Sequence, residues 1–536
     1  MRSTLLCLPL ICVLAFACGS GATSGVPADA AVDGSTDALT DAPVQADAAP
    51  TGSRNVLLII VDDVGAEEIR SFARGLRGSA ASNGSAYITD KNGNGIPDGV
   101  EDTNSDGQPD GAIATPTIDT LAAAGIRFTQ AWSNPLCSPT RAGIYTGRYA
   151  IHHGVGTPIG DTSAIWALPK DVPTLAEEMV KSGSAYKKGF FGKWHLGAKY
   201  SGTLPTDRGW DYFAGALEGE LTSYTNWKKV VVTEEGQRTD SQVIEYASTV
   251  NVNDALAWLT KQTKPWWTTV AFNAPHVPNE EPPASCLSGA TTGTTDRALY
   301  KKMLECTDKH IGTLLAGISK GVLANTTIIF LGDNGTVGGV SDVYAPNRAK
   351  GNVYQGGVHV PLIVADGASL VGSTGSGLGT ITSVGRDVSS LAQVVDIYAT
   401  MAEIVGVKSS SQDAISLASY LGSTNAPAAR TRAYTEVFKY ESASLSTLEH
   451  SLANPAAVTT ADIAKLTRTE LSAAIRSTQY KLVYVDGAYE LYDLAADPFE
   501  QVNKWCTSAT YKTEGQALLT ALRAIDASAY PAIACP

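Results

Sequence analysis

Residues 134–148 read NPLCSPTRAGIYTGR, and the rest of the chain is interpreted outward from this stretch. Within it, Cys137 precedes Pro139 by two positions and Arg141 by four, at the predicted start of a helix. A helix N-terminus favours negative charge and Arg141 adds a fixed positive charge, so the placement is typical of a nucleophile. The alternative is a buried structural cysteine in a turn, because short motifs also match by chance.

Two apolar strands are predicted to end in metal-binding side chains. Residues 55–61, NVLLIIV, form a continuous aliphatic run, as expected for a strand buried on both faces of a parallel sheet. This run ends in Asp62–Asp63, and the run 326–331 ends near Asp333–Asn334. Ligand sites of α/β proteins lie at such carboxyl ends, where oxygen ligands can bind a divalent cation. The alternatives are a helix N-cap for the first pair and a simple turn for the second.

Basic side chains recur in two further segments. Lys193 and His195 alternate along an extended segment, so both can face one anion while Trp194 points into the core. His276 lies between two prolines in the sequence APHVP, which is expected to hold it in a fixed extended conformation suited to a proton donor. Taken alone, these residues would more often be a surface pair and a structural histidine.

Together these motifs resemble the sulfatase family over about residues 54–505, and the resemblance is carried by their identity and their order. The matching segments are CSPTR at 137–141, TGRY at 146–149, GKWHLG at 192–197, the APHVP segment, GDNG at 332–335 and KGNVYQGGVHVPLI at 350–363. The last segment departs from the family pattern at Gln355, where Glu is usual, and at His359, where Arg is usual. These two changes put any transfer of substrate specificity in doubt.

The resemblance implies a calcium-dependent sulfatase that hydrolyses a sulfate monoester by S–O cleavage, with magnesium as the alternative cation. In the family the motif cysteine is oxidised by a formylglycine-generating enzyme to formylglycine, an aldehyde whose hydrate attacks sulfur. The implied metal ligands are Asp62, Asp63, Asp333, Asn334 and an oxygen of the modified Cys137. The implied catalytic residues are Cys137, Arg141, Lys193, His195, His276, Asp333 and Lys350.

The resemblance also implies roles for these side chains. The cation, Lys193, Lys350 and Arg141 would face the sulfate. Asp333 would assist the attack of one hydroxyl of the hydrate, and His195 would deprotonate the second hydroxyl, which then expels the sulfate. His276, with Lys350, would protonate the leaving alcohol or phenol. The substrate would be a sulfated small molecule, such as an aryl sulfate, or a sulfated glycan.

Two other functions stay open. A phosphomonoester or phosphonate ester hydrolase of the same superfamily would use similar residues, because sulfate and phosphate esters are nearly isosteric. In a different class, the chain could be a surface lipoprotein that binds ligands through calcium and has no catalytic activity.

Residues 90–111 are interpreted as an insertion with calcium loops. Its first part follows the D-x-N-x-N-G-x5-E pattern of a calcium-binding loop, and a second, incomplete copy follows directly. The alternative is a polar loop rich in turns. The predicted structural calcium ligands are Asp90, Asn92, Asn94, Ile96, Asp98, Glu101, Asp102, Asn104, Asp106 and Asp110.

The N-terminal region predicts export. Residues 1–18 combine a short basic start, an apolar run and a small-residue cleavage region, and AFAC at 15–18 resembles a bacterial lipobox that would lipidate Cys18. Ordinary cleavage near Ala17 is the alternative. Residues 19–53 are rich in Ala, Asp, Gly and Ser and predict a disordered tether. The protein is thus expected to be an outer-membrane lipoprotein or a periplasmic or extracellular protein, touching the membrane only through its lipid anchor.

Charge and cysteine content complete the expectations. The net charge of −13 argues against a nucleic acid as partner, and none is expected. Beyond Cys18 there are five cysteines, and in an oxidising compartment chain proximity suggests the pairs Cys286 with Cys306 and Cys506 with Cys535. Cys137 would then remain unpaired.

The predicted fold is α/β, with a large, mostly parallel central sheet flanked by helices and a smaller C-terminal antiparallel sheet. The predicted domains are the catalytic domain at residues 54–408 and the C-terminal subdomain at 409–536.

Overall fold

The computed structural model describes residues 53–73, 98, 101, 113–160, 162–197, 203–289 and 291–533. The predicted signal segment, Cys18, all but the last residue of the predicted tether, and Cys535 lie outside the described residues. So do all the predicted structural calcium ligands except Asp98 and Glu101.

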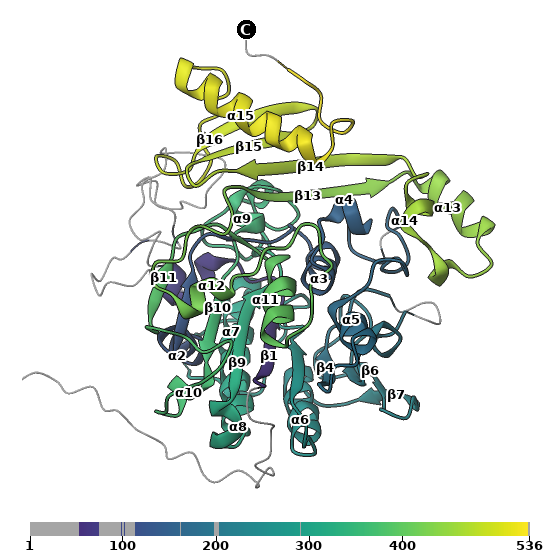
Figure 1. Cartoon of the computed structure of the whole chain (residues 1–536), viewed down its shortest axis with the longest axis vertical. Coiled ribbons are helices and arrows are strands. Elements are labelled where there is room, and N and C mark those ends of the chain that lie inside the picture. The colour runs from purple at the N-terminus through teal and green to yellow at the C-terminus, as the bar shows by residue number, and fades with distance from the viewer. Residues whose placement is uncertain are drawn as a thin grey trace, which may run out of the picture. The chain divides into compact units, whose positions relative to one another are not determined.

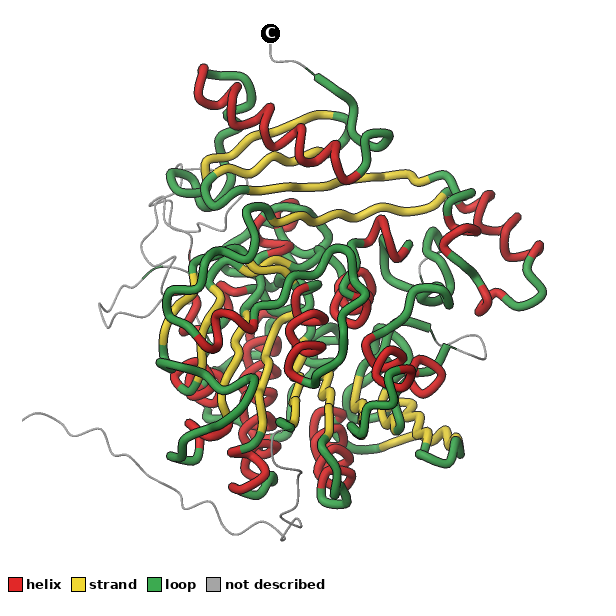
Figure 2. Tube along the Cα trace, viewed as in Figure 1, coloured by secondary structure: helices red, strands yellow, loops and turns green. Residues whose placement is uncertain are grey.

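Within the described residues, ten strands form one large sheet (Figure 2). In spatial order they are β11 (Arg386–Val388), β2 (Gly125–Phe128), β10 (Leu362–Asp366), β9 (Thr326–Gly332), β1 (Asn55–Val61), β8 (Trp266–Ala271), β4 (Lys187–Gly192), β5 (Tyr212–Gly215), β6 (Trp227–Val232) and β7 (Arg238–Val243). The five strands from β9 to β5 are parallel. On one side of them β10 pairs antiparallel with β9, and on the other β6 pairs antiparallel with β5 and β7 antiparallel with β6. The predicted mostly parallel sheet is confirmed.

Both faces of this sheet are covered by helices, as the apolar run from Val56 to Val61 in β1 requires. Val56, Leu58 and Ile60 pack into one hydrophobic cluster, while the alternate residues of the strand pack into the other. The first cluster includes residues of α3 (Cys137–Thr146), α4 (Ala150–His153), α5 (Leu175–Lys181), α11 (Asp396–Ile404), α12 (Ala418–Gly422), α13 (Ser442–Ser451) and α14 (Thr460–Ile463). The second includes residues of α1 (Arg70–Ala73), α2 (Pro116–Ala123), α6 (Ala247–Leu259), α7 (Asp296–Ala316), α8 (Lys320–Ala324) and α10 (Gly367–Leu370).

The C-terminal part forms a separate antiparallel sheet. Its strands, in spatial order, are β13 (Ala433–Tyr440), β14 (Arg468–Arg476), β15 (Tyr480–Val485) and β16 (Ala488–Asp493). Figure 1 shows α15 (Ala509–Ile525) lying across this sheet, where Leu518, Leu519 and Leu522 share a buried cluster with strand residues. On its other side the sheet packs on Trp132 and on α9 (Gln355–Val358). Two short strands of the catalytic region, β3 (Ala131–Trp132) and β12 (Ala392–Gln393), form a separate parallel pair. The predicted small antiparallel sheet is confirmed.

One helix begins with buried polar residues. α6 begins at Ala247 and ends at Leu259. Its first turns contain Ser248 and Asn251, polar residues that are nonetheless buried, so hydrophobic periodicity gives no sign of them. In the described part of the chain no helix is both long and apolar enough to cross a membrane.

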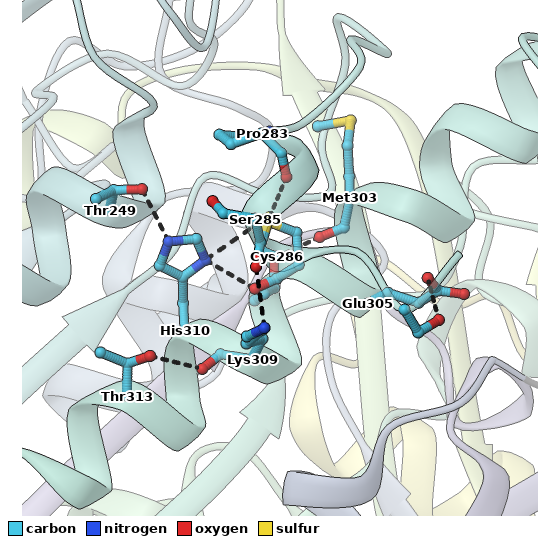
Figure 3. The surroundings of a disulfide bond; sticks show 12 residues. Thr249, Pro283, Ser285, Cys286, Met303, Glu305, Lys309, His310 and Thr313 are labelled. Atoms are coloured by element: carbon cyan, nitrogen blue, oxygen red, sulfur yellow. Dashed lines mark hydrogen bonds between the residues drawn. A yellow bond between two sulfur atoms is a disulfide. The ribbon is translucent and has the colours of Figure 1, made fainter. Parts of the chain in front are cut away.

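A disulfide joins Cys286 and Cys306, as chain proximity suggested. The disulfide joins the loop after β8 to α7. In its surroundings, shown in Figure 3, His310 contacts both Thr249 and the sulfur of Cys306. Cys506 is also disulfide-bonded. Among the described residues, Cys137 is the free cysteine, and it is buried.

Replacing both Cys286 and Cys306 by alanine is expected to lower the free energy of unfolding by about 3 kcal/mol, because the bond closes a loop of 20 residues and restricts the unfolded chain. Denaturant titration of the double variant against the wild type measures this loss. A reductant is not a substitute for the variant, because it would also open the disulfide of Cys506. A change below about 1 kcal/mol would contradict the expectation.

Candidate active site

The candidate site lies at the carboxyl ends of four neighbouring parallel strands. In spatial order these are β9, β1, β8 and β4, and each is followed by residues predicted for the site. Asp62–Asp63 follow β1, Asp333–Asn334 follow β9, and Lys193 follows β4 directly. Val61 pairs with Gly332 in the register, so Asp62–Asp63 and Asp333–Asn334 follow their strands side by side. Residues far apart in the sequence are thereby brought together at one edge.

Carboxylate and amide oxygens face one another in this cluster. The backbone N–H of Asp63 donates to Asp333 Oδ1 over 3.2 Å, and Asn334 Nδ2 donates to Asp63 Oδ1 over 2.7 Å. Asp63 has a φ of 62°, a left-handed conformation that non-glycine residues seldom adopt. Asp63 Oδ2 and Asn334 Oδ1 are buried and have no hydrogen-bond partner. Two such oxygens without a partner fit a hard divalent cation.

Cys137 is the first residue of α3, as predicted, and is 2% exposed. Its Sγ lies 3.5 Å from Asp62 Oδ1 and 3.5 Å from Lys193 Nζ. Asp62, Asp63, Cys137 and His276 each offer a ligand atom, and these atoms all lie within 4.8 Å of one another. The metal-type oxygens and the motif cysteine therefore share one small volume.

Three cations neutralise the carboxylates of the cluster. Lys193 pairs with Asp62, and Lys350 Nζ lies 2.5 Å from Asp63 Oδ1. Arg141 donates through Nε and Nη2 to Asp333 Oδ2, at 3.0 and 2.8 Å, and through Nη1 to the Lys193 carbonyl, at 2.8 Å. The guanidinium of Arg141 thus orients Asp333 and the end of β4, in contrast to the expected position facing a sulfate.

Burial also changes the pKa values of acidic groups in the cluster. Loss of hydration, together with the charge of Asp62, raises the pKa of Cys137 to about 12, despite Lys193 and Lys350. The thiol is therefore protonated near neutral pH. Burial and the charge of Asp62 also raise the pKa of Asp333 to about 6.

Asp63 and Lys350 titrate in the opposite sense. Burial opposes ionisation of Asp63, but the charges of Lys350, His276 and Lys193 outweigh it and hold the pKa of Asp63 below its ordinary value. Burial likewise opposes the charge of Lys350, yet Asp63 raises the pKa of that ammonium group. Both members of this pair are charged at neutral pH.

His195 is fixed by contacts on two sides. Its Nε2 lies 3.0 Å from the Ile159 carbonyl, and because a carbonyl only accepts, Nε2 carries the proton. The buried Nδ1 is then an acceptor and has no hydrogen-bond partner. Ser138, next to Cys137, donates to the His195 carbonyl over 2.9 Å. Trp194 is fully buried in the core, as predicted, whereas the φ of 56° at His195 ends the expected extended segment.

His276 lies in a turn, and the predicted extended conformation is wrong. Its backbone N–H donates to the Asn273 carbonyl over 3.0 Å, which closes the turn. The ring places Nδ1 at 2.8 Å from the Val277 carbonyl and Nε2 at 3.8 Å from Asp63 Oδ2. Burial, opposed by Asp63 and reinforced by Lys193 and Lys350, lowers the pKa of His276 to about 4.

The segment after β5 supplies two residues that the sequence gave no reason to select. A Cβ atom on Gly219 would lie 2.2 to 2.7 Å from atoms of the His195 ring, so only glycine fits against that ring. Tyr224 is fully buried, and its hydroxyl contacts the backbone around His276. Both contacts arise from folding of a loop that carries no recognisable motif.

Gln355 and His359, the two departures from the family pattern, contact the protein interior. Gln355 Oε1 accepts from Trp132 Nε1 over 2.9 Å, and His359 Nε2 lies 3.0 Å from the Thr129 carbonyl. These hydrogen bonds help to hold α9 against the protein interior. Neither of them involves a side chain of the carboxylate cluster.

The fold and site define a class: an α/β protein of the alkaline phosphatase-like fold, with acidic, basic and cysteine side chains at the carboxyl edge of its sheet. Within that class, the chain belongs to the sulfatase family, whose family profile, described as Sulfatase, matches residues 54–407.

Individual relatives agree with this assignment. The chain is 31% identical over 271 residues to arylsulfatase J of Mus musculus, covering 47% of this chain and 45% of that protein. The chain spans about half the length of the curated relatives it matches.

Two solved structures share the fold. The PsFucS1 sulfatase from Pseudoalteromonas sp. has a TM-score of 0.62 at 21% identity, over 90% of this chain and 92% of that chain. A structure in complex with D-glucosamine-2-N,6-O-disulfate has a TM-score of 0.58 at 18% identity, over 89% of this chain and 98% of that chain.

Proposed function

We propose that this protein hydrolyses a sulfate monoester by S–O cleavage, using a formylglycine made from Cys137 and a divalent cation held by Asp62, Asp63, Asp333 and Asn334. The observation that carries the proposal is the position of a free cysteine at a helix start, 3.5 Å from both a carboxylate oxygen and an ammonium nitrogen. Calcium is the proposed cation and magnesium the alternative, because both prefer the oxygen ligands present.

The two groups that the site would hold supply distinct chemistry. A bound cation would stabilise the negative charge that develops on the sulfate oxygens, and a formylglycine would supply the oxygen nucleophile. The buried oxygens Asp63 Oδ2 and Asn334 Oδ1, which have no partner, support a cation at this position.

The chain's own side chains divide the remaining tasks. Lys193 and Lys350 are proposed to bind the sulfate oxygens, because both ammonium groups lie in the cluster and carry charge at neutral pH. Arg141 is proposed to orient Asp333, which in turn assists the attack. His195 would act as base through Nδ1, the ring atom left without a partner.

His276 is proposed to protonate the leaving oxygen, with Lys350 as a second proton source. The ring lies in the cluster, with Nε2 3.8 Å from Asp63 Oδ2. An anionic ester bound beside the ring would favour the imidazolium form, because opposite charge raises the pKa of histidine.

A cleft of about 920 Å³ beside the cluster supports a polar leaving group. Leu136, which precedes Cys137, and Gly351, which follows Lys350, line this cleft together with residues of the C-terminal sheet. Lys439, Arg468 and Glu470 also line it. Charged groups of both signs match the hydroxyl groups of a sugar better than an apolar aromatic ring. We therefore propose a sulfated glycan as the natural substrate.

Export is proposed as well. The Cys286–Cys306 disulfide is typical of an oxidising compartment, and the apolar run at the start of the sequence fits a signal segment. The calcium loops at residues 90–110 remain a prediction from the sequence.

Mass spectrometry of the Cys137 peptide tests the proposed nucleophile. Protein from its own host is expected to carry a loss of about 18 Da relative to the thiol, as oxidation of a CH2SH side chain to an aldehyde requires. The same preparation should hydrolyse sulfated sugars, and 4-nitrophenyl sulfate faster than 4-nitrophenyl phosphate. An unmodified thiol in folded, calcium-loaded protein would favour the inactive binding protein. A faster phosphate reaction would favour the phosphoesterase.

A further inference from the structure

We propose that Tyr224 is a positioning residue for proton donation by His276. Its hydroxyl lies 2.7 Å from the Asn273 carbonyl and 2.7 Å from the His276 carbonyl. These two residues are the ends of the turn closed by the His276 N–H. One buried hydroxyl therefore fixes both ends of the turn that carries the ring. The inference rests on the sulfatase activity proposed above.

A second contact holds the same two segments together. Glu280 Oε2 accepts from the Tyr224 N–H over 2.9 Å and from Ser223 Oγ over 3.1 Å. The loop after β8 is thus attached to residues 223–224 both at the His276 turn and four residues beyond it. Further along, Glu281 pairs with Lys302 of α7 at 2.8 Å.

The frame around this loop is itself fixed. The Cys286–Cys306 disulfide anchors the far end of the loop to α7 (Figure 3). The Tyr224 ring stacks on Tyr246 with ring centroids 5.6 Å apart. Because the ring of Tyr224 and the far end of the loop are both held, the hydroxyl has a defined position from which to set the turn.

The turn at residues 273–276 sets the direction of the His276 ring. Nδ1 lies 2.8 Å from the Val277 carbonyl, so it carries the proton, and Nε2 faces Asp63 Oδ2 at 3.8 Å. Both contacts depend on the backbone that Tyr224 holds. Loss of the hydroxyl would remove the donor of the His276 carbonyl and leave the Asn273 carbonyl with the His276 N–H alone, which would allow the turn, and with it the ring, to shift. An error of about 1 Å in a catalytic group can cost about 100-fold in rate.

The test is Tyr224→Phe in the full-length, formylglycine-bearing protein, with two aryl sulfates that differ in leaving group. Phenol needs a proton from the enzyme as it leaves, whereas 4-nitrophenol is acidic enough to leave with little help. We expect kcat for phenyl sulfate to fall about tenfold or more, and kcat for 4-nitrophenyl sulfate to stay within about twofold. KM should change little for either, because Tyr224 does not touch the sulfate-binding side chains.

Tyr246→Phe is the matched control. It removes a hydroxyl from the neighbouring buried ring, and that hydroxyl has no hydrogen-bond partner among the described residues. Its ratio of rates on the two substrates is expected to equal that of the wild type. Thermal melting of both variants separates a loss of folded protein from a loss of proton donation.

A double-mutant cycle with His276→Ala decides whether Tyr224 acts through His276. In the His276→Ala background, Tyr224→Phe is expected to have no further effect on phenyl sulfate. Equal losses on both substrates, or additive losses in the cycle, would overturn the inference. A wild-type protein inactive on every sulfate ester would instead overturn the proposed function.

Discussion

Replacement of Cys137 by alanine is expected to abolish sulfate ester hydrolysis while the protein stays folded. The expected loss in kcat is about 10⁴-fold or more, as for removal of other catalytic nucleophiles. The fold should tolerate the change because the thiol is small and uncharged, and its polar contacts with Asp62 and Lys193 are both as long as 3.5 Å. The pair of Lys193 with Asp62 does not depend on the sulfur.

Turnover of 4-nitrophenyl sulfate and a thermal melt measure the two halves of this prediction. Val180→Ala, a substitution at an exposed residue of α5, controls for preparation and handling. Activity within tenfold of the wild type in Cys137→Ala would rule out any nucleophile derived from this residue. A large fall in melting temperature would show that Cys137 also contributes to packing.

Removal of divalent cations by a chelator is expected to stop catalysis without unfolding the protein. In the cluster, three carboxylates, Asp62, Asp63 and Asp333, face three cations, Arg141, Lys193 and Lys350. The formal charges therefore balance when no cation is bound, so the site does not need the ion to fold. A bound divalent ion leaves the cluster with an excess of positive charge, which favours binding of an anionic ester.

Asn334→Ala makes this prediction specific to the proposed catalytic site. It removes an oxygen ligand, leaves the formal charges unchanged and does not touch the predicted calcium loops. We expect the calcium concentration for half-maximal activity to rise about 100-fold, and activity to recover when calcium is added. Asn226→Ala, at an exposed position, is the matched control. An unchanged calcium requirement in Asn334→Ala would place the catalytic cation elsewhere.

The elements that position the site could be predicted because the residues within each element are enough to indicate it. β1 is apolar from Val56 to Val61 and is followed by two carboxylates, and α3 begins at Cys137 as predicted. Spacing along the chain cannot show that Lys193 meets Asp62, 131 residues away. The resemblance to a family placed both residues in one site in advance, but not as an ion pair.

The residues that escaped prediction act through tertiary contacts. Gly219 is read from the sequence as an ordinary loop glycine, and its role appears only when the His195 ring lies against it. Tyr224 acts through its hydroxyl on two carbonyls of another segment. Likewise, the two prolines suggested an extended His276, whereas hydrogen bonds from outside the segment hold it in a turn.

The burial of Cys137 limits when the proposed conversion to formylglycine could take place. Cys137 is 2% exposed, and all ten residues of α3 are buried. Another enzyme must surround the cysteine to oxidise it, so it has to act on the chain before folding closes the site. Under the proposed mechanism, the active fraction of a preparation would therefore be set during biosynthesis, and later treatment of the folded protein with the converting enzyme would not raise it.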